Sequence, residues 1–492
     1  MDPLFEIELD LPPPGSRDAS RRIYEQLKAA IEDGRLAVGV RLPPTRRSAG
    51  FFGVSRNTAA DIYERLANEG YVATRRGSGV FVAARPVEVA ATAAHAKFPL
   101  NPTWLRPDIV SDMGFWAEDE VAAVDADAGA PVDFRPALVD SRLFPLETFR
   151  RVSAQQLRRL ERRGAALKSP QGNQGNFRLR EAVSRHIAVT RAVVSAPGDV
   201  LVTSGAQQAF DLLARVLVRP GKTTVAIEDP GYPPMRAAFA AAGAKIAPVR
   251  VDKDGLVVED IPADARVICV CPSHQFPLGV TLSSERRRAL VALARERGAV
   301  IVEDDYDGEF RFDGGAVEAL RTASAADVVF YVGTFSKCML PALRLGFVVA
   351  PAWAMPALAA AKNCMDWHSA IPVQTSVAAF IAEGCLARHI RKTRELYRRR
   401  RELLLHLLET DLAEWLEPIA SFYGMHVAAF ARPGVDLEAA AAALQPRNVR
   451  IHTLTRYYAD APGPAGFVFG YGAADLAEIR SGARQLRGVL GA

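Results

Sequence analysis

Apolar positions in the first 85 residues follow a helical repeat and then an alternating one. The helical spacing predicts a first helix over about residues 20–33. Thr45 is expected to cap a short second helix that ends near Gly53, and Ser55 a third that ends at Gly70.

Two stretches after the third predicted helix alternate between apolar and polar residues. Residues 71–75 and 79–83 read as strands around Arg75-Arg76-Gly77-Ser78-Gly79, with glycines where a hairpin needs positive φ. Short helices joined by a tight turn and followed by a hairpin are typical of a winged helix-turn-helix, an α+β fold.

From about residue 131 the pattern changes to apolar strand runs that alternate with helical stretches. This alternation predicts an α/β domain with a mostly parallel sheet covered by helices on both faces. Helices are expected over 207–218, 284–297 and 374–381. The expected strands are 200–203, 223–227, 247–251, 267–270, 299–302, 328–332 and 345–349.

The chain therefore divides into a multidomain arrangement of 15–85, a linker at 86–130, and 131–492. The linker lacks strong periodicity and collects Ala, Pro and acids, which favours a flexible tether over an ordered arm. Its aromatic residues Trp104, Phe115 and Trp116 are candidates for docking on the large domain.

Composition excludes wholesale disorder, because 49% of the residues are hydrophobic and 24% are charged. The net charge of +5 is unevenly spread: residues 16–85 hold 13 Lys/Arg against 7 Asp/Glu, and residues 86–130 hold 2 against 8. Five cysteines without a C-x-x-C pair disfavour a disulfide scaffold or a zinc site. With an acidic start and no uninterrupted apolar span, we expect a cytoplasmic protein that does not enter a membrane.

The basic first segment predicts contact with operator double-stranded DNA. The third helix opens with polar groups at an N-terminus whose free N–H groups suit a phosphate. An amphipathic helix pair with solvated arginines is the alternative. The candidate DNA contacts are Arg46, Ser55, Arg56, Asn57 and Thr58, with Arg75, Arg76 and Gly77 at the tip of the wing.

Residues just after the predicted strands of the large domain combine into one chemistry, because ligands bind at the carboxyl ends of parallel strands. Ser204, Gly205 and Ala206 form a small turn that opens a helix, which suits a phosphate. Tyr232 can stack on a flat ring, three acids precede Tyr306, and Lys337 can form a Schiff base with an aldehyde. These are the parts that pyridoxal 5′-phosphate (PLP) requires.

The first segment resembles a GntR-type DNA-binding domain. The resemblance rests on Ile-Tyr-Glu-Gln-Leu-Lys at 23–28, Arg-Leu-Pro-Pro-Thr-Arg at 41–46, Val-Ser-Arg-Asn-Thr at 54–58 and Gly-Ser-Gly-Val-Phe-Val at 77–82. Ser48 departs from the family, which usually has an apolar residue there, so looser packing of that helix is expected.

The region from about Asp133 onward resembles fold-type-I aminotransferases, most strongly in Gly-Thr-Phe-Ser-Lys at 333–337 and Pro-Ala-Leu-Arg-Leu-Gly-Phe at 341–347. The resemblance implies that Lys337 is the Schiff-base lysine and that Asp304 faces the pyridine nitrogen, with Asp305 as an alternative. It also implies that Tyr306 bonds the 3′-oxygen and that Tyr232 covers the ring. The implied phosphate ligands are Ser204, Gly205, Ala206, Thr334, Ser336 and Arg344.

One departure narrows the resemblance. Aminotransferases carry Asn-Pro-x-Gly, whereas this chain has Phe276 in the Asn place, within His-Gln-Phe-Pro-Leu-Gly at 274–279. His274 either substitutes for the Asn as a cofactor-binding residue or is a satisfied core histidine. The pattern is similar to the MocR subfamily, in which a GntR domain is fused to an aminotransferase-like domain.

That resemblance implies a PLP-dependent transcriptional regulator that forms a homodimer with exchanged domains. An amine or amino-acid effector, or PLP itself, would be sensed through the Lys337 aldimine, and Arg456 is a candidate for binding an effector carboxylate. A surface salt bridge is the alternative for Arg456. The rival hypotheses are a catalytically active aminotransferase with a DNA-binding anchor, and a fold kept only as a dimerisation scaffold.

Overall fold

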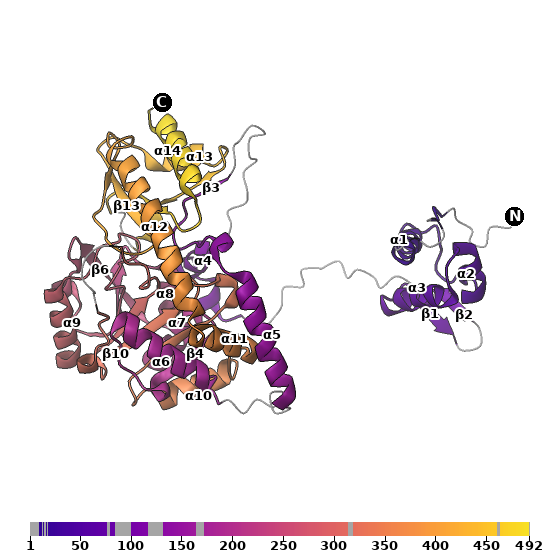
Figure 1. Ribbon diagram of the computed structural model, residues 1–492, viewed down its shortest axis with the longest axis horizontal. Helices are drawn as coiled ribbons and strands as arrows, with labels where there is room; N and C mark the ends of the chain where they lie inside the picture. Colours follow the sequence, from indigo (N-terminus) through magenta and orange to yellow (C-terminus); the bar gives the residue numbers. More distant parts are fainter. Residues whose placement is uncertain are drawn as a thin grey trace. The chain divides into compact units, whose positions relative to one another are not determined.

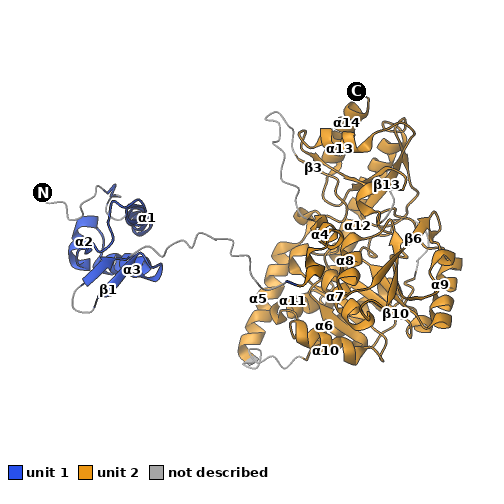
Figure 2. Ribbon diagram, turned by 180° about the vertical axis from the view of Figure 1, so that it is seen from behind, with its two compact units in different colours: residues 1–100 blue, residues 101–492 orange. Residues whose placement is uncertain are grey.

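A computed structural model describes most of the chain, as two compact units. Unit 1 comprises residues 1–100 and unit 2 residues 101–492 (Figure 2). Among the residues that the structure describes, no helix is both long and apolar enough to span a bilayer. The described residues are 9–11, 13, 16, 18–75, 79–83, 100–116, 131–163, 172–312, 318–459 and 463–491.

Unit 1 has the predicted winged helix-turn-helix fold. Its elements are α1 (Ala19–Glu32), α2 (Thr45–Phe52), α3 (Arg56–Asn68), β1 (Val72–Arg75) and β2 (Gly79–Val82). The turn between α2 and α3 reverses at Gly53, whose φ of 66° favours glycine. The strands pair antiparallel from Val72 opposite Val82 to Arg75 opposite Gly79.

Two local predictions for α2 are wrong. Thr45 is the first helical residue and does not cap the helix, because Pro44 precedes it as the cap and supplies no side-chain hydrogen bond. Ser48 does not loosen the packing: it is fully buried, and its hydroxyl lies 2.8 Å from the Tyr63 hydroxyl. The capping prediction for Ser55 is confirmed, because its Oγ accepts from the Thr58 amide at 3.1 Å.

The core of unit 2 is an eight-stranded sheet in the order β4-β11-β10-β9-β8-β5-β6-β7. Figure 1 labels β4, β6 and β10 of this sheet. Strands β10, β9, β8, β5 and β6 are parallel, while β11 is antiparallel to both of its neighbours. The predicted mostly parallel sheet is therefore confirmed. The strands are β4 (Val200–Thr203), β5 (Thr224–Asp229), β6 (Lys245–Asp252), β7 (Gly255–Leu256), β8 (Ala265–Val270), β9 (Val300–Asp305), β10 (Val329–Thr334) and β11 (Gly346–Val349).

Helices cover both faces of this sheet. Phe210, Met235 and Leu358 pack from α7, α8 and α10 on one face, whereas Leu290 of α9 packs on the other. The helices of unit 2 are α4 (Pro107–Met113), α5 (Leu146–Arg163), α6 (Phe177–Arg191), α7 (Ala206–Leu217), α8 (Pro233–Ala241), α9 (Ser284–Arg297), α10 (Met355–Met365), α11 (Ile371–Ala382), α12 (Cys385–Glu409), α13 (Leu437–Leu444) and α14 (Leu476–Leu490).

Strand β9 continues past its apolar run into the acids Glu303, Asp304 and Asp305. The sequence pattern placed these acids after the strand, but the β ladder with β10 includes all three. Successive side chains in a strand point to opposite faces, so Asp304 and Asp305 must face different surroundings.

A smaller sheet, in the order β12-β13-β16-β15, is formed by the C-terminal part of unit 2 (Figure 1). A separate parallel pair joins β14 to β3, so the first strand of the large domain is held by residues more than 300 positions later. These strands are β3 (Val132–Asp133), β12 (Leu416–Pro418), β13 (His426–Ala431), β14 (Val449–Arg450), β15 (His452–Thr453) and β16 (Gly466–Gly470).

Residues 101–116, here called the arm, begin unit 2 and pack against the rest of it. They form short turns of 3-10 helix on either side of α4, and α4 packs against α8. Phe115 is 5% exposed, and Asp112 forms an ion pair with Arg236 of α8 at 2.7 Å. This stretch is therefore ordered and not the expected flexible tether. The predicted docking is confirmed for Phe115 and Trp116, whereas Trp104 remains 52% exposed.

Candidate functional site

The start of α3 presents exposed polar and cationic side chains. Arg46, Arg56 and Asn57 are exposed, and none makes a hydrogen bond or an ion pair with another described residue. Five other described basic residues of unit 1 form ion pairs; among them, Arg65 and Lys28 both contact Glu69, at 3.5 and 3.3 Å. The uncommitted cations thus gather where α2 and α3 begin, as a phosphate-binding surface requires.

Of the three DNA contacts predicted at the tip of the wing, the structure describes Arg75. Arg75 is exposed, and its guanidinium lies 4.9 Å from the centre of the Phe81 ring. The predictions for Arg76 and Gly77 lie outside the described residues. Arg41, which sequence reasoning did not select, lies beside the wing, since a Cβ at Gly79 would come within 2.9 Å of its Nε. Arg41 reaches the wing because an antiparallel β-bridge joins it to Phe81, which lies 40 residues later in the chain.

Lys337 follows β10 and lies among buried carboxylates. Its side chain is only partly exposed, and its Nζ donates to the carbonyl oxygen of Ala137 at 2.5 Å. Loss of surrounding water lowers the pKa of its amine to about 8, against the opposing charges of Asp307 and Asp304. A lysine with a lowered pKa is more often neutral and therefore nucleophilic.

The two neighbouring aspartates of β9 have different partners. Asp305 accepts hydrogen bonds from Arg191 Nε and from the Tyr331 hydroxyl, both at 2.5 Å. Asp304 has no such cation, and its Oδ1 is buried without a hydrogen-bond partner among the described residues. Burial raises the pKa of Asp304 to about 8, and the negative charge of Asp305 adds to the shift. Asp304 is thus the aspartate with a free acceptor.

The residues predicted to hold a phosphate lie close together at the N-terminus of α7. Gly205 has a φ of 84°, and a Cβ there would lie 2.9 Å from Arg344 Nη2. The same guanidinium nitrogen donates to the Ser204 carbonyl at 3.2 Å. Thr334 and Ser336 bond to each other through their hydroxyls at 3.0 Å. The Arg344 guanidinium thus lies against the N-terminus of α7, where Gly205 has no side chain to keep it away.

Aromatic side chains gather near Asp304, which acts electrostatically on both Tyr232 and Tyr306. The ring of Phe276 lies edge-on to Tyr232 and Tyr306, with centroids 5.5 and 5.6 Å apart. Phe276 is buried, so the position that carries Asn in aminotransferases is here a packing centre. His274 makes its contacts behind Tyr306: the Tyr306 hydroxyl lies 2.9 Å from His274 Nδ1 and 3.0 Å from its carbonyl oxygen.

Several buried polar residues of this region escaped sequence reasoning. Glu228 accepts from the Cys271 amide at 2.9 Å, and burial raises the pKa of Glu228 to about 8. Asp307 bonds to His274, while His426 arrives from β13, far away in the sequence. Asp307 follows the acid run and could have been considered, but no local signal marks His426.

Arg456 lies above the arm. It is exposed, and its guanidinium is 5.8 Å from the centre of the Phe115 ring. The next residue of the arm, Trp116, donates from Nε1 to the Tyr232 hydroxyl at 2.9 Å. The arm therefore links the neighbourhood of Arg456 to the tyrosine predicted to cover the ring.

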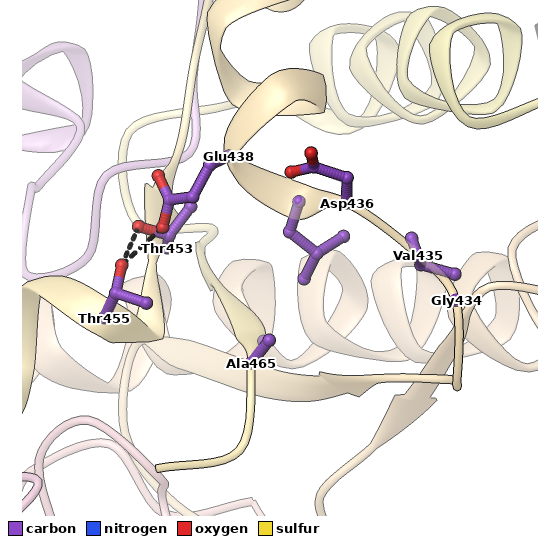
Figure 3. A pocket seen from close by; sticks show the side chains of 9 residues that line it. Gly434, Val435, Asp436, Glu438, Thr453, Thr455 and Ala465 are labelled. Atoms are coloured by element: carbon purple, nitrogen blue, oxygen red, sulfur yellow. Dashed lines mark hydrogen bonds between the residues drawn. The ribbon is translucent and has the colours of Figure 1, made fainter. Parts of the chain in front are cut away.

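A separate pocket of about 350 Å³ lies at the start of α13 (Figure 3). Glu438 accepts from the Thr455 hydroxyl at 2.5 Å, and Asp436 accepts from the Ala439 amide at 3.0 Å. None of the residues predicted to hold a cofactor lines this pocket. The Glu438 and Asp436 carboxylates in it already accept hydrogen bonds from the protein.

Comparisons with known proteins match both units. Residues 143–461 match the family "Aminotransferase class I and II", and residues 19–82 match "Bacterial regulatory proteins, gntR family". The chain is 34% identical to the probable rhizopine catabolism regulatory protein MocR of Rhizobium meliloti, over 95% of this chain and 92% of that protein. It is 29% identical to the pyridoxine biosynthesis transcriptional regulator PdxR of Corynebacterium glutamicum, over 97% of each.

Among solved structures, the large unit is similar to the α-aminoadipate aminotransferase LysN of Thermus thermophilus, in complex with N-(5′-phosphopyridoxyl)-L-leucine. The TM-score is 0.65 at 27% identity, with 73% of this chain and 92% of that chain covered. The predicted fold-type-I aminotransferase architecture is thus confirmed for the large unit.

Proposed function

Because the chain belongs to the aminotransferase class I and II family and carries a GntR-family module in the MocR arrangement, we propose that it is a PLP-dependent transcriptional regulator. Unit 1 binds operator DNA, and unit 2 holds PLP and senses either PLP itself or an amine or amino-acid effector. The observation that carries the proposal is the presence, in one chain, of exposed, unpaired cations on α2 and α3 and of Lys337 near Asp304, whose buried Oδ1 has no hydrogen-bond partner among the described residues.

The residues of unit 2 fit PLP. A protonated pyridine nitrogen would satisfy the buried Asp304 Oδ1, which otherwise costs free energy as an orphaned acceptor. The N-terminus of α7 at Gly205, with the Arg344 guanidinium packed against it, suits a phosphate monoester. Bound PLP supplies an aldehyde carbon that condenses with a primary amine. The residues proposed to hold it are Ser204, Gly205, Ala206, Tyr232, Asp304, Tyr306, Thr334, Ser336, Lys337 and Arg344.

Lys337 is the proposed covalent attachment point. Its lowered pKa keeps a fraction of the amine neutral near pH 7, and the Ala137 carbonyl orients it through a hydrogen bond. We assign the 3′-oxygen to Tyr306 and one face of the ring to Tyr232. His274 acts on the cofactor through Tyr306 in this proposal, because its Nδ1 is already engaged with the Tyr306 hydroxyl and with Asp307.

The arm supports a route from effector to DNA module. We assign Arg456 to an effector carboxylate, since a guanidinium can bind it bidentately. An effector there would lie next to Phe115, and the arm it would displace is the stretch of chain that leads back to unit 1. Helix-turn-helix modules bind paired half-sites as dimers, so we propose a homodimer, with domains exchanged between the chains.

The experiment is operator binding measured by fluorescence anisotropy, with and without PLP and a panel of amines and amino acids. The expected result is a shift of at least about threefold in operator affinity on adding PLP or one amine, which Lys337→Ala abolishes. Equal affinity under every condition, with PLP shown to be bound, would overturn the sensing role.

The same preparations separate this proposal from a working aminotransferase carrying a DNA anchor. Lys337, Asp304 and Tyr306 are all present, so some turnover is compatible with the site. Sustained keto-acid production, with many turnovers per chain, would replace the regulator-first interpretation. Keto-acid production that stops at about one turnover per chain supports sensing.

A further inference from the structure

Three ionisable side chains gather behind Tyr306, although they come from different parts of the fold. His274 follows β8, Asp307 follows β9, and His426 begins β13 of the smaller sheet. All three are buried, and one ligating atom from each lies within 4.8 Å of the others. We call them the His-Asp-His cluster.

The hydrogen bonds of the cluster converge on the Tyr306 hydroxyl. Asp307 Oδ2 lies 3.0 Å from His274 Nδ1, and the Tyr306 oxygen lies 2.9 Å from the same nitrogen. The phenol donates to the His274 main-chain carbonyl at 3.0 Å. Both the imidazole and the main chain of His274 therefore engage the Tyr306 hydroxyl.

His274 is clamped in this orientation. A Cβ at Gly424 would lie 1.9 Å from the His274 ring, and one at Gly279 would lie 3.2 Å from its Nε2. Both glycines have positive φ, so the backbone approaches the imidazole where another residue would collide. A ring held this tightly has a fixed direction for its Nδ1.

His426 completes the cluster from the other side. Its Nε2 lies 3.0 Å from the Pro277 carbonyl oxygen, which only accepts, so this nitrogen carries the proton. Its Nδ1 is then a bare acceptor, buried without a hydrogen-bond partner among the described residues. The rings of His426 and His274 lie 4.4 Å apart.

Burial keeps both imidazoles neutral, since it lowers the pKa of His274 and of His426 to about 3. Burial also raises the pKa of Asp307 to about 8. The cluster thus contains two neutral rings and one carboxyl, which forms a hydrogen bond with His274. The charged or titratable groups that face its members are Glu228, Cys271, Asp304, Asp305, Glu309, Lys337 and Arg401.

We propose that His274, supported by Asp307 and His426, is a positioning residue that controls how strongly the Tyr306 hydroxyl donates to the 3′-oxygen of bound PLP. The inference rests on the proposed function, because it needs PLP in the site. In aminotransferases an Asn bonds the 3′-oxygen directly. That Asn is missing here, so Tyr306 is the donor that remains, and His274 competes with the 3′-oxygen for the Tyr306 hydroxyl.

The test is the pH titration of the visible absorbance band of the PLP-loaded full chain. His274→Asn removes the imidazole from beside the Tyr306 hydroxyl but keeps the main-chain carbonyl. One fewer group then competes for the phenol, so the midpoint pH should fall by about 0.5 unit or more, the equivalent of one net hydrogen bond. Tyr306→Phe removes the donor and should raise the midpoint. In the Tyr306→Phe background, His274→Asn should have no further effect.

His389→Asn is the matched control. His389 is also buried and also has a lowered pKa, but it packs against Phe144, away from the cluster, so the midpoint should not change. If His274→Asn does not fold, His274→Gln takes its place in the cycle.

A second readout needs no cofactor. In ¹⁵N-histidine-labelled, PLP-free protein, His426 should be neutral and protonated at Nε2 at pH 6, and His426→Asn identifies its signal. A charged His426 at that pH would contradict the assignment.

Three results overturn the proposal: an unchanged midpoint in His274→Asn, an equal shift in the Tyr306→Phe background, or a stoichiometric metal ion that His274→Asn removes. The first two apply to protein with a visible band. If wild type shows no band with PLP, the proposed function fails together with the inference that rests on it.

Discussion

The two units use charged side chains in opposite ways. In unit 1 the residues assigned to DNA, such as Arg46 and Arg56, are exposed and uncommitted. In unit 2 the ionisable groups assigned to the pyridine nitrogen and to covalent attachment, Asp304 and Lys337, are largely withdrawn from water, and their pKa values both move to about 8.

The difference follows from the ligands. A phosphate backbone is met at the surface, where net charge and an open helix N-terminus suffice. A covalent cofactor needs a lysine that is partly neutral and an acceptor with no competing partner, and burial creates both. Substitutions in one unit should therefore leave the other unit's function intact, and the following predictions test that separation.

The largest effect is expected at Lys337. Lys337→Ala removes the amine that would attach PLP, so the visible absorbance band should disappear entirely. Lys253→Ala, at an exposed lysine of the same unit, should leave the band unchanged. Absorbance of the PLP-incubated, desalted proteins measures both. A normal band in Lys337→Ala would break the assignment.

The two aspartates of β9 should respond in opposite directions. Asp305→Asn leaves Arg191 without its 2.5 Å partner in the interior, which should cost about 3–5 kcal/mol of unfolding free energy. All five tryptophans lie beyond residue 100, so tryptophan fluorescence during urea unfolding reports on unit 2 alone. Equal losses in Asp305→Asn and Asp304→Asn would contradict the distinction between the two residues.

Asp304→Asn should instead stabilise the PLP-free protein at higher pH. Burial raises the pKa of Asp304 from 3.8 to about 8, so the native state retains a proton that the unfolded chain releases. The contribution of Asp304 to stability is therefore full below about pH 4 and is lost as the pH rises toward 8. The Asn variant should gain roughly 1–3 kcal/mol over wild type between pH 4 and pH 8, measured by the same unfolding.

Arg56→Ala should weaken specific operator binding by about 1–3 kcal/mol while leaving PLP absorbance intact. Arg65→Ala is the control on the same helix, because Arg65 is already paired with Glu69. Anisotropy titrations at two salt concentrations distinguish a base contact from a phosphate contact, since only the latter reduces the salt slope. Equal losses in both variants would refute a specific role for the start of α3.

The smallest effect is expected at Ser48. Ser48→Ala removes the hydrogen bond with Tyr63 but leaves that phenol its second acceptor, the Pro43 carbonyl at 3.0 Å. We expect a loss of about 1 kcal/mol in the local stability of unit 1, with PLP absorbance unchanged. Amide hydrogen exchange in α2 and α3 measures it. A stabilised variant would show that an apolar residue is preferred there after all.

Sequence reasoning predicted much of the fold because its signals are local. The Ser55 cap, the Gly53 turn and the apolar strand runs each depend on a few neighbouring residues. The strand ends were predicted too short where β9 continues into acids, because a buried carboxylate is expected only when a partner such as Arg191 is known.

The sequence by itself determined which chemistry is present: a basic helix-turn-helix, a lysine after one strand and acids after another. Only the tertiary structure decided which of these groups are already paired within the protein and which are available to a ligand. It paired Asp305 with Arg191 and left Asp304 open, docked Phe115 of the arm under Arg456, and brought His426 to His274. Hydrogen bonds and burial between distant segments made these choices, because a side chain's free energy depends on partners that its sequence neighbours do not specify.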